Sequence, residues 1–361
     1  MSGIETPEPF SVENFRKLKG PLIDLRTPQE FSQGHWPGAI NLPLFNNEER
    51  IIIGKTYKKK GQRKAIILGL ELIRPRLLGI IKSLKEIKEE NRLRNYGDIS
   101  QHLKLYCWRG GMRSASVAWL SNLFDLSPVL LLGGYKAYRK WVLKQFINDW
   151  PIKLIGGKTG SGKTDLLLSL SKKGISIIDL EGLANHRGST FGSLGLPPQP
   201  STEHYENIIG EKLYKFSQGN NKEIWVEAES ANLGCCTIPH EFFKQMKQAE
   251  MLEITRTSKE RISNLSEVYG CQNSQQLEEA TLRISKRLGP QRTVKALNAI
   301  KRKNWFAACA EMLDYYDRCY EHGLLKVKRK TSIDISGLSS DEAAEKLLKK
   351  GFIFSANSPQ S

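Results

Sequence analysis

The sequence predicts an α/β protein with two successive parallel-sheet domains, because two of its loops connect an apolar strand to a helix. In the first half, the run LKLY leads into Cys107, a Gly-Gly pair and the apolar-rich segment SASVAWLSNLF. In the second half, a short strand over residues 152–155 leads into a glycine-rich loop and the helical segment DLLLSLSKKG. Since strands that alternate with helices are typical of parallel sheets, each half is expected to form one α/β domain.

Hydrophobic runs and capping residues place the elements of the first domain, expected over residues 10–145. Ser11 is expected to cap a helix that ends near residue 18, and a second helix is predicted over residues 135–150. Short apolar runs predict strands at residues 22–25, 40–43, 103–106 and 129–134. The segment over about residues 46–98 has helical spacing and is rich in Lys and Arg, so it is predicted to be a helical insertion.

The second domain is expected over residues 151–354, followed by a disordered tail at residues 355–361. Further strands are predicted at residues 175–179, 224–227 and 252–254. Helices are expected to dominate its C-terminal part, over residues 258–269 and from residue 274 to about residue 303. Ser339 and Glu342 have the spacing of a capping box that opens a last helix.

Composition and charge indicate the class of partner. The chain has 361 residues, enough for two ordinary domains, and its 39% hydrophobic content can support two cores. Its net charge of +17 favours a polyanionic partner, most simply nucleic acid. The alternative is a basic protein whose charges are only solvated. The same two alternatives apply to the basic patch formed by Tyr57 and residues 58–60 of the insertion.

Cysteine usage and hydropathy exclude several classes of protein. None of the six cysteines forms a C-x-x-C pair, so a structural zinc site is not expected. The segment MSGIETPEPF lacks a signal-peptide pattern, and no apolar run approaches the roughly twenty residues of a membrane span. We therefore expect a reduced, cytoplasmic protein that does not enter a membrane, and we expect a monomer.

Cys107 is the candidate nucleophile of the first domain. It follows a strand and precedes a helix, so backbone N–H groups and the helix dipole are expected to stabilise its thiolate. Arg109 and Arg113 add positive charge and could hold an anionic substrate through bidentate hydrogen bonds. The alternative is a buried cysteine that behaves as a small hydrophobic residue.

The second domain carries a complete G-x-x-x-x-G-K-[ST] phosphate loop over residues 157–164. Glycines allow the backbone N–H groups to surround a phosphate at the N-terminus of the following helix. Lysine supplies a point charge, and the threonine hydroxyl is the usual contact of Mg²⁺, which makes this ion a possible ligand. The predicted phosphate-binding residues are Gly157, Gly160, Gly162, Lys163 and Thr164.

Acidic residues end two of the predicted strands near this loop. Asp179 ends one strand and Glu227 ends another, with Glu229 two residues later. Such acids are candidates to polarise magnesium or water, although a carboxylate that caps a neighbouring helix is an equal alternative. The sequence contains no further metal site that we would assign with certainty.

The motifs together resemble a known family. LIDLRTPQEFSQGHWPGAINLP followed by YCWRGGMRS looks like a rhodanese domain, in which Asp24 and residues 35–39 match scaffold positions and His35 is expected to be structural. With IIIGKTYKKKGQRKAIILGLEL, GKTGSGKT, DLEGLANHRGS and LGPQR in this order, the chain resembles the bacterial tRNA 2-selenouridine synthase family. It departs from the family pattern at Ala228 and Ala231, which weakens any role for Glu227 or Glu229.

The resemblance implies a tRNA-modifying transferase that acts on the anticodon arm. Sulfur of the wobble 2-thiouridine would be alkylated by geranyl diphosphate, and selenium from selenophosphate would then replace the geranylthio group. Cys107 would carry selenium as an S-selanylcysteine, with Arg109 and Arg113 binding selenophosphate. We expect the phosphate loop to hold the diphosphate of the geranyl donor. Two alternatives remain open: an ATP-using tRNA sulfurtransferase or kinase, and a non-catalytic tRNA-binding protein.

Overall fold

The computed structural model describes residues 7–94, 101–219, 223–323 and 329–354. Its contacts divide the chain into two compact units, Met1–Lys144 and Gln145–Ser361, which we call unit 1 and unit 2. The predicted tail at residues 355–361 lies outside the described residues. Among the described residues, no helix has the length and apolar character needed to cross a membrane.

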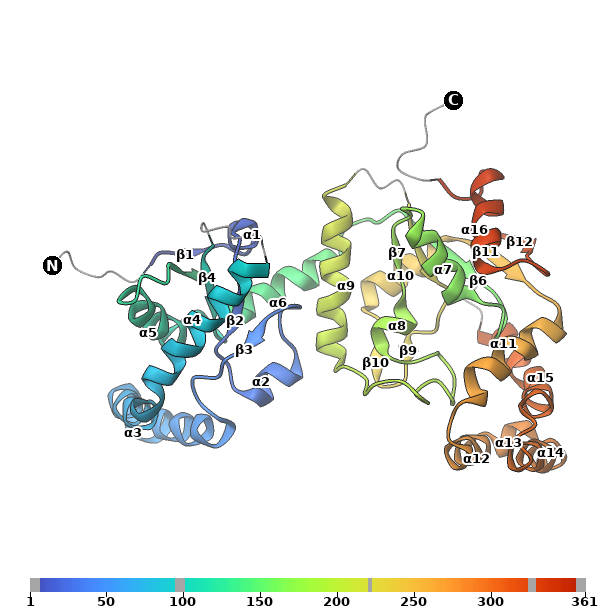
Figure 1. Ribbon diagram of the computed structural model, residues 1–361, viewed down its shortest axis with the longest axis horizontal. Coiled ribbons are helices and arrows are strands. Elements are labelled where there is room, and N and C mark those ends of the chain that lie inside the picture. The colour runs from blue at the N-terminus through green and yellow to red at the C-terminus, as the bar shows by residue number, and fades with distance from the viewer. Residues whose placement is uncertain (1–6, 95–100, 220–222, 324–328, 355–361) are drawn as a thin grey trace. The chain divides into compact units, whose positions relative to one another are not determined.

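Unit 1 is built on a five-stranded parallel sheet (Figure 1). The strands are β1 (Pro9–Phe10), β2 (Leu22–Asp24), β3 (Ile40–Asn41), β4 (Leu103–Tyr106) and β5 (Pro128–Leu131), in the spatial order β1-β5-β4-β2-β3. Every pair is parallel. All four residues of the central strand β4 are buried, which explains why this strand is a continuous apolar run with little alternation.

Short helices follow four of these strands. They are α1 (Val12–Lys17), α2 (Pro28–Gln33), α5 (Met112–Asn122) and α6 (Gly134–Gln145). Ser11 caps α1 as predicted, and Thr27 and Glu30 form a capping box on α2. The helix predicted to reach residue 150 ends at Gln145, because side chains replace the helical donors beyond it. Trp150 donates its indole N–H to the Gln145 carbonyl at 2.7 Å.

The predicted insertion is helical and packs on the same core. It consists of α3 (Asn47–Ile73), a 3₁₀ turn η1 (Arg74–Arg76) and α4 (Leu77–Arg94) (Figure 1). Gly61 interrupts the helical backbone of α3 with φ of +83°, a conformation that glycine adopts without strain. Ile73 of α3 and Leu84 of α4 join the hydrophobic cluster that also contains Leu105 of β4.

Unit 2 contains a second five-stranded parallel sheet. Its strands are β6 (Ile152–Gly156), β7 (Ile177–Ile178), β8 (Ile224–Glu227), β11 (Glu250–Thr255) and β12 (Lys330–Asp334), in the order β12-β11-β6-β8-β7. The sequence analysis missed β12, because this edge strand is largely exposed and has no apolar run. The α/β class predicted for both halves is confirmed, and in each sheet the strand before the candidate loop lies in the interior.

Helices surround this sheet. They are α7 (Lys163–Lys172), α8 (Leu180–Ala184), α9 (Thr202–Ser217), α10 (His240–Gln248) and α16 (Ser340–Lys349), and a small hairpin joins β9 (Asn232–Leu233) to β10 (Cys236–Thr237). α7 packs against β6, β7 and β8, and α16 packs against α7. The capping box predicted from Ser339 and Glu342 opens α16. The sequence analysis did not identify α9 or α10.

The C-terminal helices form a separate hydrophobic cluster within unit 2. They are α11 (Ser258–Gly270), α12 (Ser274–Arg283), α13 (Ser285–Leu288), α14 (Pro290–Lys301) and α15 (Trp305–Gly323). The helical region predicted from residue 274 to about residue 303 is therefore divided into three helices. Gly289, with φ of +93°, and Pro290, at the first position of α14, explain the last break.

Candidate active site

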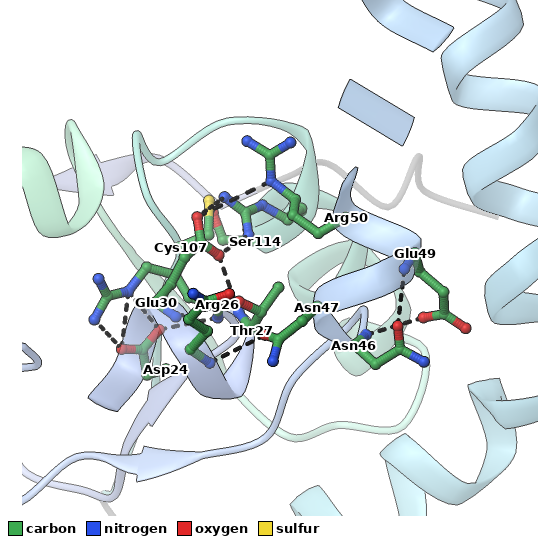
Figure 2. A network of polar contacts seen from close by, with 12 residues as sticks. Asp24, Arg26, Thr27, Glu30, Asn46, Asn47, Glu49, Arg50, Cys107 and Ser114 are labelled. Carbon is green, nitrogen blue, oxygen red and sulfur yellow. Dashed lines mark hydrogen bonds and ion pairs between the residues drawn. The ribbon is translucent and has the colours of Figure 1, made fainter. Parts of the chain in front are cut away.

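Cys107 lies where the strand β4 passes into the loop before α5. Its side chain is buried, and its Sγ lies 3.2 Å from the Ser114 Oγ (Figure 2). The Ser114 hydroxyl also lies within donating distance of the Gly111 carbonyl, at 3.2 Å. The serine hydroxyl is thus a local donor that can turn from the Gly111 carbonyl to the Cys107 sulfur. The sequence analysis missed Ser114, although it stands within the quoted motif.

Glycines bring a second loop against the cysteine loop. Gly134 follows β5, and a Cβ on it would lie 2.3 Å from the Cys107 carbonyl oxygen. A Cβ on Gly110 would lie 2.6 Å from the Leu131 carbonyl oxygen. Because both glycines have positive φ and neither has room for a side chain, this close approach requires glycine. Tyr135 then donates its backbone N–H to the Cys107 carbonyl at 2.8 Å, which fixes the loop.

The two predicted arginines have different environments. Arg113 donates to Glu30 of α2, with Nη1 2.9 Å from Oε2, so a carboxylate already offsets its charge. Burial opposes ionisation of Glu30, yet the hydrogen bond and charge of Arg113 hold the pKa of this carboxyl below its usual value. Arg109 lies on the loop and is exposed. An oxyanion at Arg113 would therefore have to compete with Glu30, whereas Arg109 is accessible to a ligand.

A buried ion pair supports the loop from β2. Arg26 and Asp24 are both fully buried, and their side chains meet at 2.7 Å. The Arg26 guanidinium also donates to the Gly34 carbonyl and lies 3.7 Å from the centre of the Tyr135 ring. A buried charge is stable only when it is paired and hydrogen-bonded, and Arg26 meets both conditions. It thereby packs the end of β2 against Tyr135, whose backbone N–H donates to the Cys107 carbonyl. His35 stacks on Phe31, consistent with a structural position.

The phosphate loop of unit 2 joins β6 to α7. Gly157, Gly160 and Gly162 all have positive φ, and a Cβ on Gly160 would lie 2.7 Å from the Arg261 carbonyl oxygen. The Lys163 ammonium folds back and donates to the Gly157 carbonyl at 3.1 Å. The loop therefore ends at the N-terminus of a ten-residue helix with a lysine across it, the arrangement that binds phosphate groups.

Residues distant in sequence hold the carbonyl groups of this loop. Arg261 donates to the Thr159 carbonyl at 2.9 Å, Asn264 donates to the Gly160 carbonyl at 2.9 Å, and Arg256 donates to the Ser161 carbonyl at 3.1 Å. Arg261 is itself held by Asp317 of α15. These residues position the loop, and no local motif in the sequence indicated them.

Acidic side chains meet at the start of α7. The Thr164 hydroxyl lies 2.8 Å from Glu227 and 3.1 Å from Glu181, and the Lys163 ammonium lies 3.8 Å from Glu229. Glu227 is fully buried and also accepts the backbone N–H of Glu181 at 3.1 Å. It therefore caps the first turn of α8, as the second alternative predicts, and it also contacts the threonine of the phosphate loop.

Asp179, the remaining predicted acid, caps a helix, and the sequence analysis missed Glu181. Asp179 caps α8 by accepting the backbone N–H of Gly182 at 2.7 Å. Glu181, which we did not select, contacts Thr164 directly. The only signal for it was its place inside the motif DLEGLANHRGS. No group of three or more His, Cys, Asp or Glu side chains in the described part of the chain is arranged to hold a metal ion by itself.

Comparisons with known proteins agree with the geometry of both loops. A family model described as a rhodanese-like domain matches residues 11–140, and one described as the tRNA 2-selenouridine synthase AAA domain matches residues 150–349. The tRNA 2-selenouridine synthase of Marinobacter nauticus is 34% identical over 341 residues, which cover 84% of this chain and 88% of the relative. The chain belongs to the tRNA 2-selenouridine synthase family.

Other members of the family match over different lengths. The synthase of Hydrogenovibrio crunogenus is 33% identical over 88% of this chain and 92% of its own length. The synthase of Nitrosomonas europaea is 40% identical over 69% of this chain, and the match spans only 63% of that relative. The predicted family and its rhodanese domain are thus confirmed. Despite the departures at Ala228 and Ala231, Glu227 and Glu229 reach the threonine and lysine of the phosphate loop.

The carboxylates at this loop predict a pH dependence of stability. Burial raises the pKa of Glu181 from 4.5 to about 7, with Glu229 adding to the shift and Lys163 opposing it. Between these values the folded state holds a proton that the unfolded chain releases, so the free energy of unfolding falls as pH rises from 5 to 8. The contribution of Glu181 is at most about 3 kcal/mol. Urea unfolding of wild type and Glu181→Gln at both pH values measures it.

The glutamine variant is expected to lose less stability over this range than the wild type, because it carries no proton to lose. Glu267→Gln, at an exposed position of α11, is the matched control and should retain the wild-type dependence. An equal fall for wild type and Glu181→Gln would contradict the assignment of a buried, protonated Glu181.

Proposed function

We propose that this chain is a tRNA 2-selenouridine synthase that replaces sulfur by selenium in the wobble 2-thiouridine of tRNA. The observation that carries this proposal is that one chain combines a cysteine held at the N-terminus of α5 with a phosphate loop whose lysine and threonine meet buried carboxylates. The first arrangement suits a nucleophile that carries a chalcogen, and the second suits a diphosphate substrate.

The first step is alkylation in unit 2. Sulfur of the 2-thiouridine attacks the first carbon of geranyl diphosphate, a carbon–sulfur bond forms, and diphosphate leaves with the electrons of the broken carbon–oxygen bond. The N3 proton of the base is released to water, which leaves a neutral S-geranyl nucleoside. Lys163 and the loop N–H groups stabilise the negative charge that develops on the diphosphate. Mg²⁺, which prefers oxygen ligands, would be held by the Thr164 hydroxyl with Glu227 beside it, and it would add charge stabilisation there.

The second step takes place at Cys107 in unit 1. The Cys107 thiolate attacks the selenium of selenophosphate. An S–Se bond forms, the Se–P bond breaks, and phosphorus leaves with its electron pair as phosphite, so the cysteine carries an S-selanyl group. The terminal selenium then attacks C2 of the alkylated base, and geranylthiolate leaves with the electrons of the C2–S bond. This thiolate attacks the Cys107 Sγ and breaks the S–Se bond, which releases the selenouridine and leaves a disulfide that a thiol reductant reduces. Alkylation is required because it converts a poor leaving group into a good one. Arg109 is the accessible cation for the selenophosphate oxyanion, while Arg113 exchanges its hydrogen bonds with Glu30 for the same ligand.

The charge of the chain supports a tRNA substrate. The net charge of +17 includes exposed lysines on α3, at residues 58–60, in the same unit as Cys107. Phosphate contacts of this kind give an affinity that falls steeply with salt. The anticodon arm is the part of tRNA that carries the wobble base, and single-stranded loops of RNA present their bases to a protein without helix opening.

Mass spectrometry of wobble nucleosides tests the proposal. The full chain is incubated with thiolated tRNA, geranyl diphosphate and selenophosphate. We expect 2-selenouridine when both donors are present and the S-geranyl nucleoside when selenophosphate is omitted. Absence of both products, with thiolated tRNA recovered intact, would overturn the proposed function.

A nucleoside triphosphate is a second candidate for the phosphate loop. The contact between Thr164 and the buried Glu227, at 2.8 Å, is the observation that favours it, because a threonine and an acid at a loop of this type commonly hold a magnesium nucleotide. Hydrolysis of ATP that increases on addition of tRNA would support this ligand. Geranylation that proceeds at full rate without nucleotide would exclude a requirement for it.

A further inference from the structure

A largely apolar groove lies within unit 1, between the insertion and α5. Its volume is about 290 Å³. Ile53, Leu70 and Ile73 line it from α3, Ile80 from α4, and Val117 and Leu120 from α5. Among the described residues, the charged side chains at its wall are Arg50 and Arg113, and both lie near Glu30. The groove can therefore bury a hydrocarbon chain but offers little to a polar ligand.

The groove begins beside the reactive loop. Met112 and Arg113, which follow the Cys107 loop directly, line it. Cys107 belongs to the same hydrophobic cluster as five buried residues of the groove wall: Leu44, Phe45, Ile73, Ile80 and Val117. A chain held in this groove would thus have one end close to the loop that carries Cys107.

The rim of the groove is basic and aromatic. Tyr57 of α3 lines the groove and is 57% exposed, and the three lysines that follow it are exposed on the same helix. Such a rim attracts phosphate groups, and an exposed ring can stack on an unpaired base. The groove therefore fits a polyanion that carries an apolar chain, and free hydrocarbon would not use the basic rim.

We propose that this groove binds the geranyl chain of the S-geranylated wobble nucleotide while Cys107 delivers selenium. The inference rests on the proposed function, and it assigns to the insertion a part in recognising the intermediate. The volume is sufficient, since an engineered cavity of about 150 Å³ accommodates benzene and a geranyl group has ten carbons. Holding the leaving group here would also orient C2 of the base towards the cysteine loop.

Binding of synthetic anticodon stem-loops to the full chain tests the groove without requiring catalysis. One stem-loop carries 2-thiouridine and the other carries chemically prepared S-geranyl-2-thiouridine. Because each buried methylene raises affinity roughly fourfold, we expect wild type to prefer the geranylated loop by at least about tenfold. In Leu70→Glu, a carboxylate at the groove should remove most of this preference.

Ile67→Glu is the matched control. Ile67 and Leu70 lie on the same helix and are 50% and 59% exposed, but Ile67 does not line the groove. Both variants add one negative charge to α3, so both should weaken binding of the thiolated loop to the same extent. Only Leu70→Glu should lose the preference, and both positions are exposed enough for the variants to fold.

The results of the binding experiment and of the nucleoside assay test the groove proposal and the proposed function separately. Three results would overturn the proposed binding of the geranyl chain in the groove, even if 2-selenouridine is still made. They are equal binding of both stem-loops by the wild type, a preference for the geranylated loop that Leu70→Glu keeps, and a loss of that preference to the same extent in both variants. A wild type that forms neither product in the nucleoside assay would instead reject the proposed function, whatever the stem-loops show.

Discussion

Replacing Cys107 by serine is expected to reduce selenium incorporation by at least about a thousandfold while the S-geranyl nucleoside accumulates. Serine fits the same buried site beside Ser114, so the loop and its contact with Tyr135 should persist. Its hydroxyl cannot hold selenium as a transferable adduct, because a neutral alcohol is a poor nucleophile at neutral pH. Quantifying both nucleosides in one digest measures the loss and the accumulation together.

Cys236→Ser is the matched control for this experiment. Cys236 is as buried as Cys107 but lies in β10 of unit 2, and burial raises the pKa of its thiol to about 12. This variant should incorporate selenium at the wild-type rate. If Cys107→Ser still forms 2-selenouridine at a comparable rate, selenium does not pass through this cysteine. If neither nucleoside forms in Cys107→Ser, the serine has disturbed more than the transfer step.

Sequence reasoning located both loops because each is a local pattern. A strand, a run of glycines with a reactive residue, and an amphipathic helix are contiguous, and their geometry follows from the backbone conformations that glycine permits. The α/β class followed from the same alternation. The edge strand β12 has no apolar run, so the same reasoning did not find it. The helices α9 and α10 were missed although Ser201 caps α9 and the buried Phe242 and Met246 of α10 have helical spacing.

The partners of the predicted residues could not be found in this way, because they come from distant parts of the chain. Glu30 and Arg113 are 83 positions apart, and Thr159 and Arg261 are 102 positions apart. No pattern of spacing connects such pairs, and only the folded sheet brings them together. The pairing with Glu30 matters for anion binding, because Arg113 is then one half of an ion pair and no longer an available cation.

The carboxylates near the phosphate loop could likewise be predicted only in part from the sequence. The sequence analysis selected Asp179 and Glu227 because each ends a predicted strand. In the folded chain, Asp179 caps a helix and Glu181 contacts Thr164. Glu181 lies in the short helix α8, where a polar residue would ordinarily be exposed. Its proximity to Glu227 and Glu229 depends on the register of three separate segments, which the sequence pattern does not reveal.

Replacing Lys163 by alanine is expected to reduce geranylation by about a hundredfold or more, because one preorganised cation at a developing anion contributes about this much to the rate. Lys158→Ala is the matched control, since Lys158 lies in the same loop but is paired with Glu321 and Asp317. It should retain most of the activity. Formation of the S-geranyl nucleoside from thiolated tRNA, measured as an initial rate, compares the two variants.

A second substrate determines whether the two units divide the chemistry. When tRNA that already carries S-geranyl-2-thiouridine is supplied, Lys163→Ala should incorporate selenium as wild type does, because the phosphate loop is no longer needed. Cys107→Ser should not be rescued in this way. If Lys163→Ala also fails with the pre-alkylated tRNA, the phosphate loop takes part in the selenium step, and two independent steps in two units would no longer describe the reaction.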